Sequence, residues 1–175
     1  MDITEFRAGL KNGKISGWYI FCGEEDYLKK YYMNELRLVT APDDAFSLFN
    51  YVSFEGVDID FGAVAEAIKS PPMMSEYKLI EWKFAPIDTL KESEKSALFE
   101  LFSLKEEYPY AIFSIMATAD GFDAGTAKRA SRMAARLSEA FEILNFPKST
   151  DSQLLSWLKK HFDAEGISVD LAALN

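Results

Sequence analysis

The sequence predicts an α/β fold, a doubly wound and mostly parallel sheet of five strands with helices on its faces. Short apolar runs alternate along the chain with segments in which apolar residues recur at helical spacing. The first apolar run is also bracketed by glycines, at 17 and 23, and 49% of the residues are hydrophobic. Strands buried on both faces are typically continuous apolar runs, and alternation of strands with helices is typical of parallel sheets.

Five short runs are the expected strands. They cover residues 17–23, 49–54, 77–82, 110–116 and 141–146. The fourth run is the most apolar, so we expect it near the centre of the sheet, where both faces are covered.

Helices are expected where apolar residues recur with helical periodicity between and after these runs. They cover residues 26–38, 61–68, 90–104, 125–138 and 151–162. Asp58 or Asp60 is expected to cap the second helix, and prolines 71 and 72 to end it. Ser149 or Thr150 is expected to cap the last helix.

The pattern changes after Pro147, which predicts a domain boundary. Residues 1–147 are expected to form the α/β domain, and residues 148–175 to begin a second, helical domain. A further helix is expected to start within residues 167–170. We expect the chain to stop just inside this second domain, because so short a helix cannot bury its apolar face.

Composition excludes several classes of protein. The formal net charge is −9, from 19 basic and 28 acidic residues. An acidic surface repels phosphate backbones, so unaided binding to nucleic acid is not expected.

Cys22 is the only cysteine, so no intrachain disulfide can form. The start of the chain has no signal-peptide pattern and no apolar run is long enough to span a membrane, so a cytoplasmic protein is expected.

The turn after the first strand lacks the residues that bind a nucleotide. A P-loop reads G-x-x-x-x-G-K-S/T, whereas residues 23–26 read GEED, with three carboxylates where phosphate oxygens would lie. Lys29 and Lys30 come one turn too late to substitute. The third strand ends at residues 81–83 without an Asp-Glu pair to hold magnesium. We therefore expect an ATPase-like domain that has lost its nucleotide chemistry, with no bound cofactor.

Other catalytic arrangements find little support. His161 is the only histidine and is expected on the surface of the last helix. Cys22 ends a buried strand, where a small core residue is more typical than a nucleophile. Ligands for zinc are too few. No catalytic residue is assigned, and whether the chain is an enzyme stays open.

A phosphoacceptor receiver domain, or another α/β domain that binds a small ligand, is the alternative. A receiver has acids after its first strand, as residues 24–26 provide, and Thr118 and Lys148 could supply the other conserved groups. However, Asp88 follows the third strand about six residues too late to accept the phosphoryl group.

Three stretches resemble the delta subunit of the bacterial DNA polymerase III clamp loader. They are residues 19–28 (YIFCGEEDYL), residues 67–80 (AIKSPPMMSEYKLI) and residues 146–148 (FPK), which lead into the helix with Leu154, Leu155 and Trp157. The resemblance implies an AAA+-like domain that neither binds nor hydrolyses ATP, within a complex that has DNA-directed DNA polymerase activity. It also implies that the protein binds and opens the beta sliding clamp for loading onto primed DNA. The other implied partners are the gamma/tau and delta prime subunits, with DNA contacted only through the assembled complex.

The resemblance also implies where the sliding clamp binds. In the family, the contact is an apolar pair on the turn before the third strand, where this chain has Pro72, Met73 and Met74. The family often has Leu or Phe there, so methionine is a departure. Prolines stiffen the turn, and methionine adapts to apolar pockets. From the residues alone, the two methionines could equally close the end of the core.

One further motif is similar to a clamp-loader feature. Ser131-Arg132-Met133 resembles the Ser-Arg-Cys motif by which some subunits present an arginine to a neighbour's ATP. It lacks the cysteine, and we expect it to belong to a solvated basic helix together with Lys128, Arg129 and Arg136.

Overall fold

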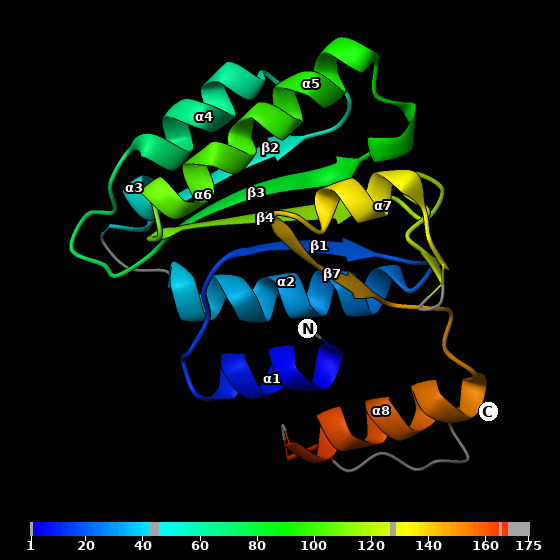
Figure 1. Cartoon of the computed structure of the whole chain (residues 1–175). Coiled ribbons are helices and arrows are strands. Elements are labelled where there is room, and N and C mark those ends of the chain that lie inside the picture. The colour runs from blue at the N-terminus through cyan, green and yellow to red at the C-terminus, as the bar shows by residue number, and fades with distance from the viewer. Residues whose placement is uncertain (1, 43–45, 127–128, 165, 168–175) are drawn as a thin grey trace.

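Five parallel strands form the main sheet of this protein. The computed structural model describes residues 2–42, 46–126, 129–164 and 166–167. The strand order is β2-β3-β4-β1-β7, with every neighbouring pair parallel (Figure 1). The strands are β1 (Trp18–Cys22), β2 (Tyr51–Glu55), β3 (Lys78–Ala85), β4 (Ala111–Ala117) and β7 (Phe141–Asn145). The predicted five-stranded parallel sheet is confirmed.

Strand β4 lies at the centre of this sheet, as its apolar sequence predicted. All seven of its residues are buried. The edge strand β2 has no buried residue, because only one side of it pairs with another strand. Burial therefore follows the position of each strand in the sheet.

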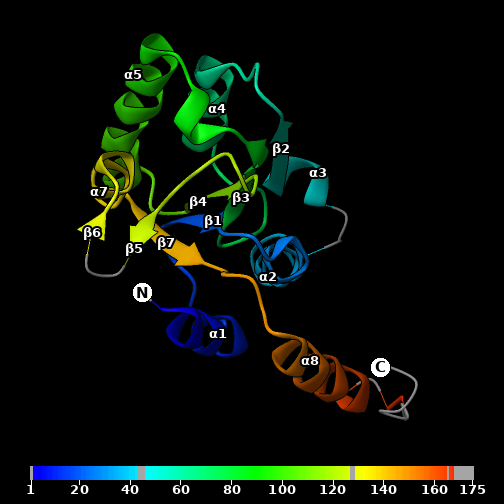
Figure 2. The ribbon, with the colours of Figure 1, turned by 90° about the vertical axis from the view of Figure 1, so that its right-hand side faces the viewer.

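Helices cover both faces of the sheet (Figures 1 and 2). On one face lie α4 (Phe61–Lys69), α5 (Glu92–Glu100) and α7 (Arg132–Leu137). On the other face lie α2 (Asp26–Thr40) and, beside it, α1 (Ile3–Lys11). The remaining helical segments are α3 (Ser47–Asn50), η1 (Ile87–Thr89), η2 (Leu101–Ser103), α6 (Leu104–Glu107) and α8 (Asp151–Ala164). Helices on both sides of a parallel sheet confirm the doubly wound architecture.

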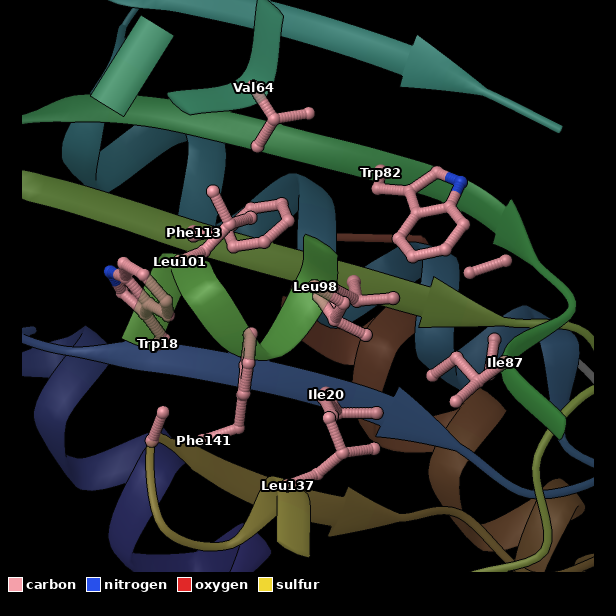
Figure 3. Close-up of a cluster of buried hydrophobic side chains, with 14 of the residues drawn as sticks. Trp18, Ile20, Val64, Trp82, Ile87, Leu98, Leu101, Phe113, Leu137 and Phe141 are labelled. Atoms are coloured by element: carbon pink, nitrogen blue, oxygen red, sulfur yellow. The ribbon is translucent and has the colours of Figure 1, made fainter. Parts of the chain in front are cut away.

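The core under α4, α5 and α7 is built on two buried tryptophans (Figure 3). The ring of Trp18 meets that of Phe113 edge to face, with centroids 5.4 Å apart. Both indole N–H groups find a backbone acceptor, the carbonyl of Ala111 for Trp18 and that of Gly56 for Trp82. The polar group of each tryptophan is therefore satisfied while the rings fill the space between sheet and helices.

A second core lies on the opposite face, under α2 and α1. Alternation along β1 places Tyr19 and Phe21 on this side, where they contact Phe6 of α1. Helix α1 has no counterpart among the helices expected from the sequence. It buries only Phe6 and Leu10, which is too few apolar positions for a clear periodicity. Asp2 and Glu5 form a capping box at its start, and that signal was present in the sequence.

The basic helix expected over residues 125–138 was wrong in its first half. Gly125 has a φ of +76° and pairs with Ala130 in the short antiparallel ladder of β5 (Gly125–Thr126) and β6 (Arg129–Ala130). The helix begins only at Arg132, where the hydroxyl of Ser131 accepts a hydrogen bond from the N–H of Ala134. Lys128 lies outside the described residues.

Two other expected elements differ at their bounds. Residues 49 and 50 were assigned to the second strand, but they belong to the short helix α3, and β2 begins at Tyr51. The helix expected over residues 90–104 starts at Glu92, passes through a 3₁₀ turn at 101–103 and continues to Glu107. Such tightening is frequent at helix ends.

Helix α8 follows the sheet and lies near α2 and α1 (Figure 1). The hydroxyl of Thr150 accepts from the N–H of Gln153, so Thr150 caps this helix, one of the two expected residues. The further helix expected from residues 167–170 falls on positions 168–175, outside the described residues. The boundary at residue 147 stays a prediction. Within the described ranges, no helix is both long and apolar enough to cross a membrane.

Candidate functional site

The turn between α4 and β3 presents both predicted methionines to solvent. We call residues 70–77 the methionine turn. The side chain of Met73 is 42% exposed and that of Met74 is 83% exposed, while Pro72 is half-buried. These two methionines therefore do not close the end of the core, which was the other reading of the sequence. Both are available for contact with another molecule.

Tyr110, the residue directly before β4, fixes both ends of this turn. The hydroxyl of Tyr110 donates to the carbonyl of Lys69, the last residue of α4, at 2.6 Å. The carbonyl of Tyr110 accepts from the N–H of Lys78, the first residue of β3, at 3.0 Å. One residue thus sets the separation of the two elements that the turn connects.

A buried asparagine fixes the middle of the turn. Asn50 is 2% exposed, and its amide group bonds to the backbone of Met73 twice. Its Nδ2 donates to the carbonyl of Met73 at 2.8 Å, and its Oδ1 accepts from the N–H of Met73 at 2.7 Å. Met74 has a φ of +53°, an unfavourable conformation for a residue with a side chain. The paired hydrogen bonds to the preceding residue help to keep this backbone in one conformation.

Helix α3 brings more apolar surface beside the turn. Leu48 is 87% exposed and Phe49 is 52% exposed, and both directly precede Asn50 in the chain. Sequence reasoning missed Leu48, Phe49 and Asn50, because residues 49–54 were assigned to a strand. The signal available was the absence of charge from residue 46 to residue 54.

The segment after β7 packs against the turn that binds nucleotide in P-loop proteins. Gly23, directly after β1, has a φ of +97°, and a Cβ there would lie 2.3 Å from the carbonyl oxygen of Phe146. The same carbonyl accepts from the N–H of Glu25 at 3.1 Å. The carboxylate of Glu25 accepts from the N–H of Ser149 at 3.2 Å. The segment after β7 therefore packs on this turn and uses one of the N–H groups that a phosphate would need.

Lys29 lies beneath the same turn and is fully buried. Its ammonium donates to the carbonyls of Gly23 at 2.7 Å and Ala117 at 2.9 Å and pairs with Asp26 at 2.8 Å. Lys29 reaches back to this turn because helical side chains extend toward the N-terminus. That it cannot substitute for the lysine of a P-loop stays a prediction. However, the ammonium bonds to backbone carbonyls, so the turn encloses a cation of the protein itself.

The end of β3 carries an ion pair on its α2 face. Glu81 is 2% exposed and accepts from the hydroxyl of Tyr51 at 2.6 Å. Lys83 lies 3.4 Å from Glu81 and donates to the same hydroxyl at 2.8 Å. Burial alone would lower the pKa of Lys83, but the hydrogen bond with Tyr51 and the charge of Glu81 raise it above its ordinary value. The negative charge of Glu81 is thus balanced by the ammonium of Lys83 and hydrogen-bonded by Tyr51.

The remaining catalytic candidates are not brought together. Cys22 is buried as expected, and burial raises the pKa of its thiol to about 11. His161 is half-buried, stacked on Trp157 with ring centroids 5.2 Å apart, so it is more covered than the expected surface histidine. Among the described residues, no group of three or more His, Cys, Asp or Glu side chains could hold a metal ion.

The strand order does not match a receiver domain. Receiver-like folds have the order 2-1-3-4-5, in which the first strand lies next to the second. Here β1 lies between β4 and β7 instead. Asp88, the displaced acid, accepts from the N–H of Asp123 at 2.7 Å. The receiver alternative is therefore excluded by topology.

The motif at residues 131–133 belongs to a short helix with a partly covered face. Arg132 is exposed, whereas the guanidinium of Arg136 lies over the rings of Phe99 and Phe102, at 5.3 and 5.6 Å from their centroids. Arg136 also pairs with Glu139. The expected solvated face is thus observed at Arg132, whereas Arg136 packs on two aromatic rings.

Several solved structures share this fold. The chain matches the Bacillus subtilis DNA clamp loader delta protein with a TM-score of 0.68 at 16% identity, over 98% of this chain and 50% of that one. It matches a DNA polymerase III gamma subunit-related protein of Thermotoga maritima with a TM-score of 0.59 at 8% identity, over 91% and 52%. For Thermotoga maritima RuvB the TM-score is 0.53 at 15% identity, over 97% and 50%. These likenesses confirm the AAA+-like fold, and the chain spans about half the length of each.

No curated protein matches the chain. The profile of the family described as DNA polymerase III, delta subunit, matches residues 19–114. The matched region runs from β1 into β4 and includes Lys29, Asn50 and the methionine turn. Because the match covers more than half of the sequence, the chain belongs to the DNA polymerase III delta subunit family.

Proposed function

We propose that this chain is the clamp-loader subunit that binds the beta sliding clamp and opens it for loading onto primed DNA. The contact is made by Pro72, Met73 and Met74. The observation that carries the proposal is the exposure of both methionines on a turn whose backbone is fixed from inside the protein. Two large apolar side chains exposed on one turn, in a chain of this family, fit a protein-binding role.

The energetics favour a turn of this kind as an anchor. Full burial of an exposed methionine side chain contributes about 1.5–3 kcal/mol. Asn50 and Tyr110 already order the backbone before any partner arrives. Binding then costs little conformational entropy, so more of the burial energy appears as affinity. Methionine is flexible and polarisable, which suits a pocket of irregular shape.

We propose further that the subunit works without binding or hydrolysing ATP. Two contacts support this: the carbonyl of Gly23 accepts from the ammonium of Lys29, and the N–H of Glu25 is already bonded to the carbonyl of Phe146 and so is not free to bind a phosphate. Loading is then powered by ATP on neighbouring subunits of the complex, in which gamma/tau and delta prime are the proposed partners. DNA is contacted only through the assembled complex, because a chain of net charge −9 repels a phosphate backbone. The proposed location is the cytoplasm.

Surface plasmon resonance with the cognate sliding clamp tests the proposal. The variant Met73→Asp with Met74→Asp is expected to keep its circular dichroism spectrum and to lose clamp binding. The matched control is Leu38→Asp with Val57→Asp, whose side chains are 49% and 58% exposed on other parts of the surface. It is expected to bind like the unmodified chain. Unchanged affinity in the methionine variant would discard the site, and no binding by the unmodified chain would discard the function.

A further inference from the structure

Helix α3 and the methionine turn adjoin each other, although the residues that join them are 23 positions apart in the sequence. The bond between Nδ2 of Asn50 and the carbonyl of Met73 spans this separation. Leu48 and Phe49 precede Asn50 directly, and Met74 follows Met73. In Figure 1 the loop between α4 and β3 runs beside α3. A partner molecule that covers the turn therefore lies next to α3.

The two segments share a second property, the absence of charge. Residues 46–54 and 70–75 contain no Asp, Glu, Lys or Arg, although 27% of the chain is charged. Charged, exposed side chains lie on either side of this uncharged stretch, Lys69 at the end of α4 and Glu76 near the end of the methionine turn. An apolar centre containing methionine and aromatic residues, with a charged rim, is the usual composition of a protein–protein interface.

The size of the surface also favours a contact of two parts. A specific complex buries about 800 Å² on each partner. Two methionine side chains on one turn supply only part of such an area. Leu48 and Phe49 are large, and their exposures of 87% and 52% leave most of their surface free to be buried. Scattered exposed leucines need no explanation, but four large apolar side chains on two adjoining segments do.

We infer that Leu48 and Phe49 form a second part of the surface that binds the sliding clamp. Asn50 is the positioning residue that fixes α3 against the methionine turn. The inference rests on the proposed function, and it deepens that function by adding a second contact. Since the buried amide holds the two parts in one arrangement, the clamp is recognised by their combined shape.

Clamp binding by variants of α3 tests this inference. Leu48→Ser with Phe49→Ser is expected to weaken binding to the immobilised clamp by at least about tenfold, the loss expected when a large apolar contact is truncated. Leu48→Ser alone is expected to weaken it several-fold. Leu48 is 87% exposed, so its replacement leaves packing intact even if the double variant is less stable. The control is Leu38→Ser with Val57→Ser, which is expected to bind normally.

Each result separates the inference from the proposed function. If the unmodified chain does not bind the clamp, both fail. If the aspartate variants of Met73 and Met74 abolish binding while both α3 variants bind normally, only the second contact is wrong. An equal loss in the control would show a general surface effect and would overturn the inference. Light scattering gives the remaining outcome. If the unmodified chain self-associates, the α3 variants do not, and these variants still bind the clamp normally, then α3 contacts a second copy of this chain. That result would refute the inference.

Discussion

The ammonium of Lys29 lies 2.7 Å from the carbonyl oxygen of Gly23, at the edge of the sheet where related folds bind nucleotides. It also bonds to the carbonyl of Ala117, so one buried side chain joins the ends of β1 and β4 to the start of α2. Phosphate-binding turns direct N–H groups toward the ligand. Here the carbonyl oxygens of Gly23 and Ala117 bind the ammonium of Lys29. These groups accept hydrogen bonds from a cation, whereas a phosphate-binding turn donates hydrogen bonds to an anion.

Replacing Lys29 is expected to destabilise the whole domain. Lys29→Met leaves the carbonyls of Gly23 and Ala117 without their buried donor and removes the pair with Asp26. A loss of about 2–4 kcal/mol in the free energy of unfolding is expected for such a network, measured by urea denaturation. Lys30 is exposed, so Lys30→Met is the matched control, with an expected change within about 0.5 kcal/mol. Equal stability of the two variants would show that the Lys29 contacts contribute little.

Isothermal titration calorimetry with ATP and magnesium is expected to give no heat of binding. Glu24 and Glu25 follow Gly23 in the turn that binds phosphates in P-loop proteins, and the N–H of Glu25 already bonds to Phe146. The negative charges of these carboxylates repel those of a triphosphate and so disfavour its binding. A saturable heat of binding would contradict the proposed loss of nucleotide chemistry.

The elements predicted correctly are those whose burial produces a clear hydrophobic pattern in a short stretch of sequence. Strands β1 and β4 are apolar at every position or nearly so, because both faces are covered by helices. Helix α1 escaped prediction because it buries only Phe6 and Leu10. The first half of the helix expected at 125–138 was wrong because the positive φ of Gly125 allows a tight ladder instead.

The thiol of Cys22 is expected to be unreactive in the folded protein. Burial raises its pKa to about 11, so at pH 8 only about one molecule in a thousand carries the thiolate. The thiolate is the reactive form. A colorimetric thiol assay at pH 8 should detect no free thiol in the native protein and one equivalent after denaturation. Rapid reaction of the native protein would place Cys22 in an accessible site.

Trp157 is expected to hold α8 against α2. Its ring meets those of Tyr27 and Tyr31 edge to face, with centroids 5.2 and 5.3 Å apart. Each such pair contributes about 0.5–1.5 kcal/mol beyond burial. Trp157→Ala should increase amide hydrogen exchange in α8 and leave the sheet unchanged, measured by mass spectrometry. Lys159→Ala, at an exposed position of the same helix, is the control. Unchanged exchange in α8 would show that other contacts hold it.

The candidate site was predicted only in part, for a physical reason. Met73 and Met74 were found through their turn and the resemblance to a family, but the sequence left open whether they are buried. Their exposure depends on how Asn50 and Tyr110 fix the turn, and these contacts join residues 23 and 41 positions apart. Hydrogen bonds between segments so distant leave no periodic signal in a single sequence.

Site-specific photo-crosslinking tests the central claim most directly. A benzophenone amino acid replaces Met74, which is 83% exposed, or Val57, which is 58% exposed, as the control. Each chain is mixed with the cognate sliding clamp and irradiated. A covalent product from position 74, mapped by mass spectrometry to an apolar pocket of the clamp, with none from position 57, is the predicted result. Equal crosslinking from the two positions, or none from position 74 while the clamp is bound, would contradict it.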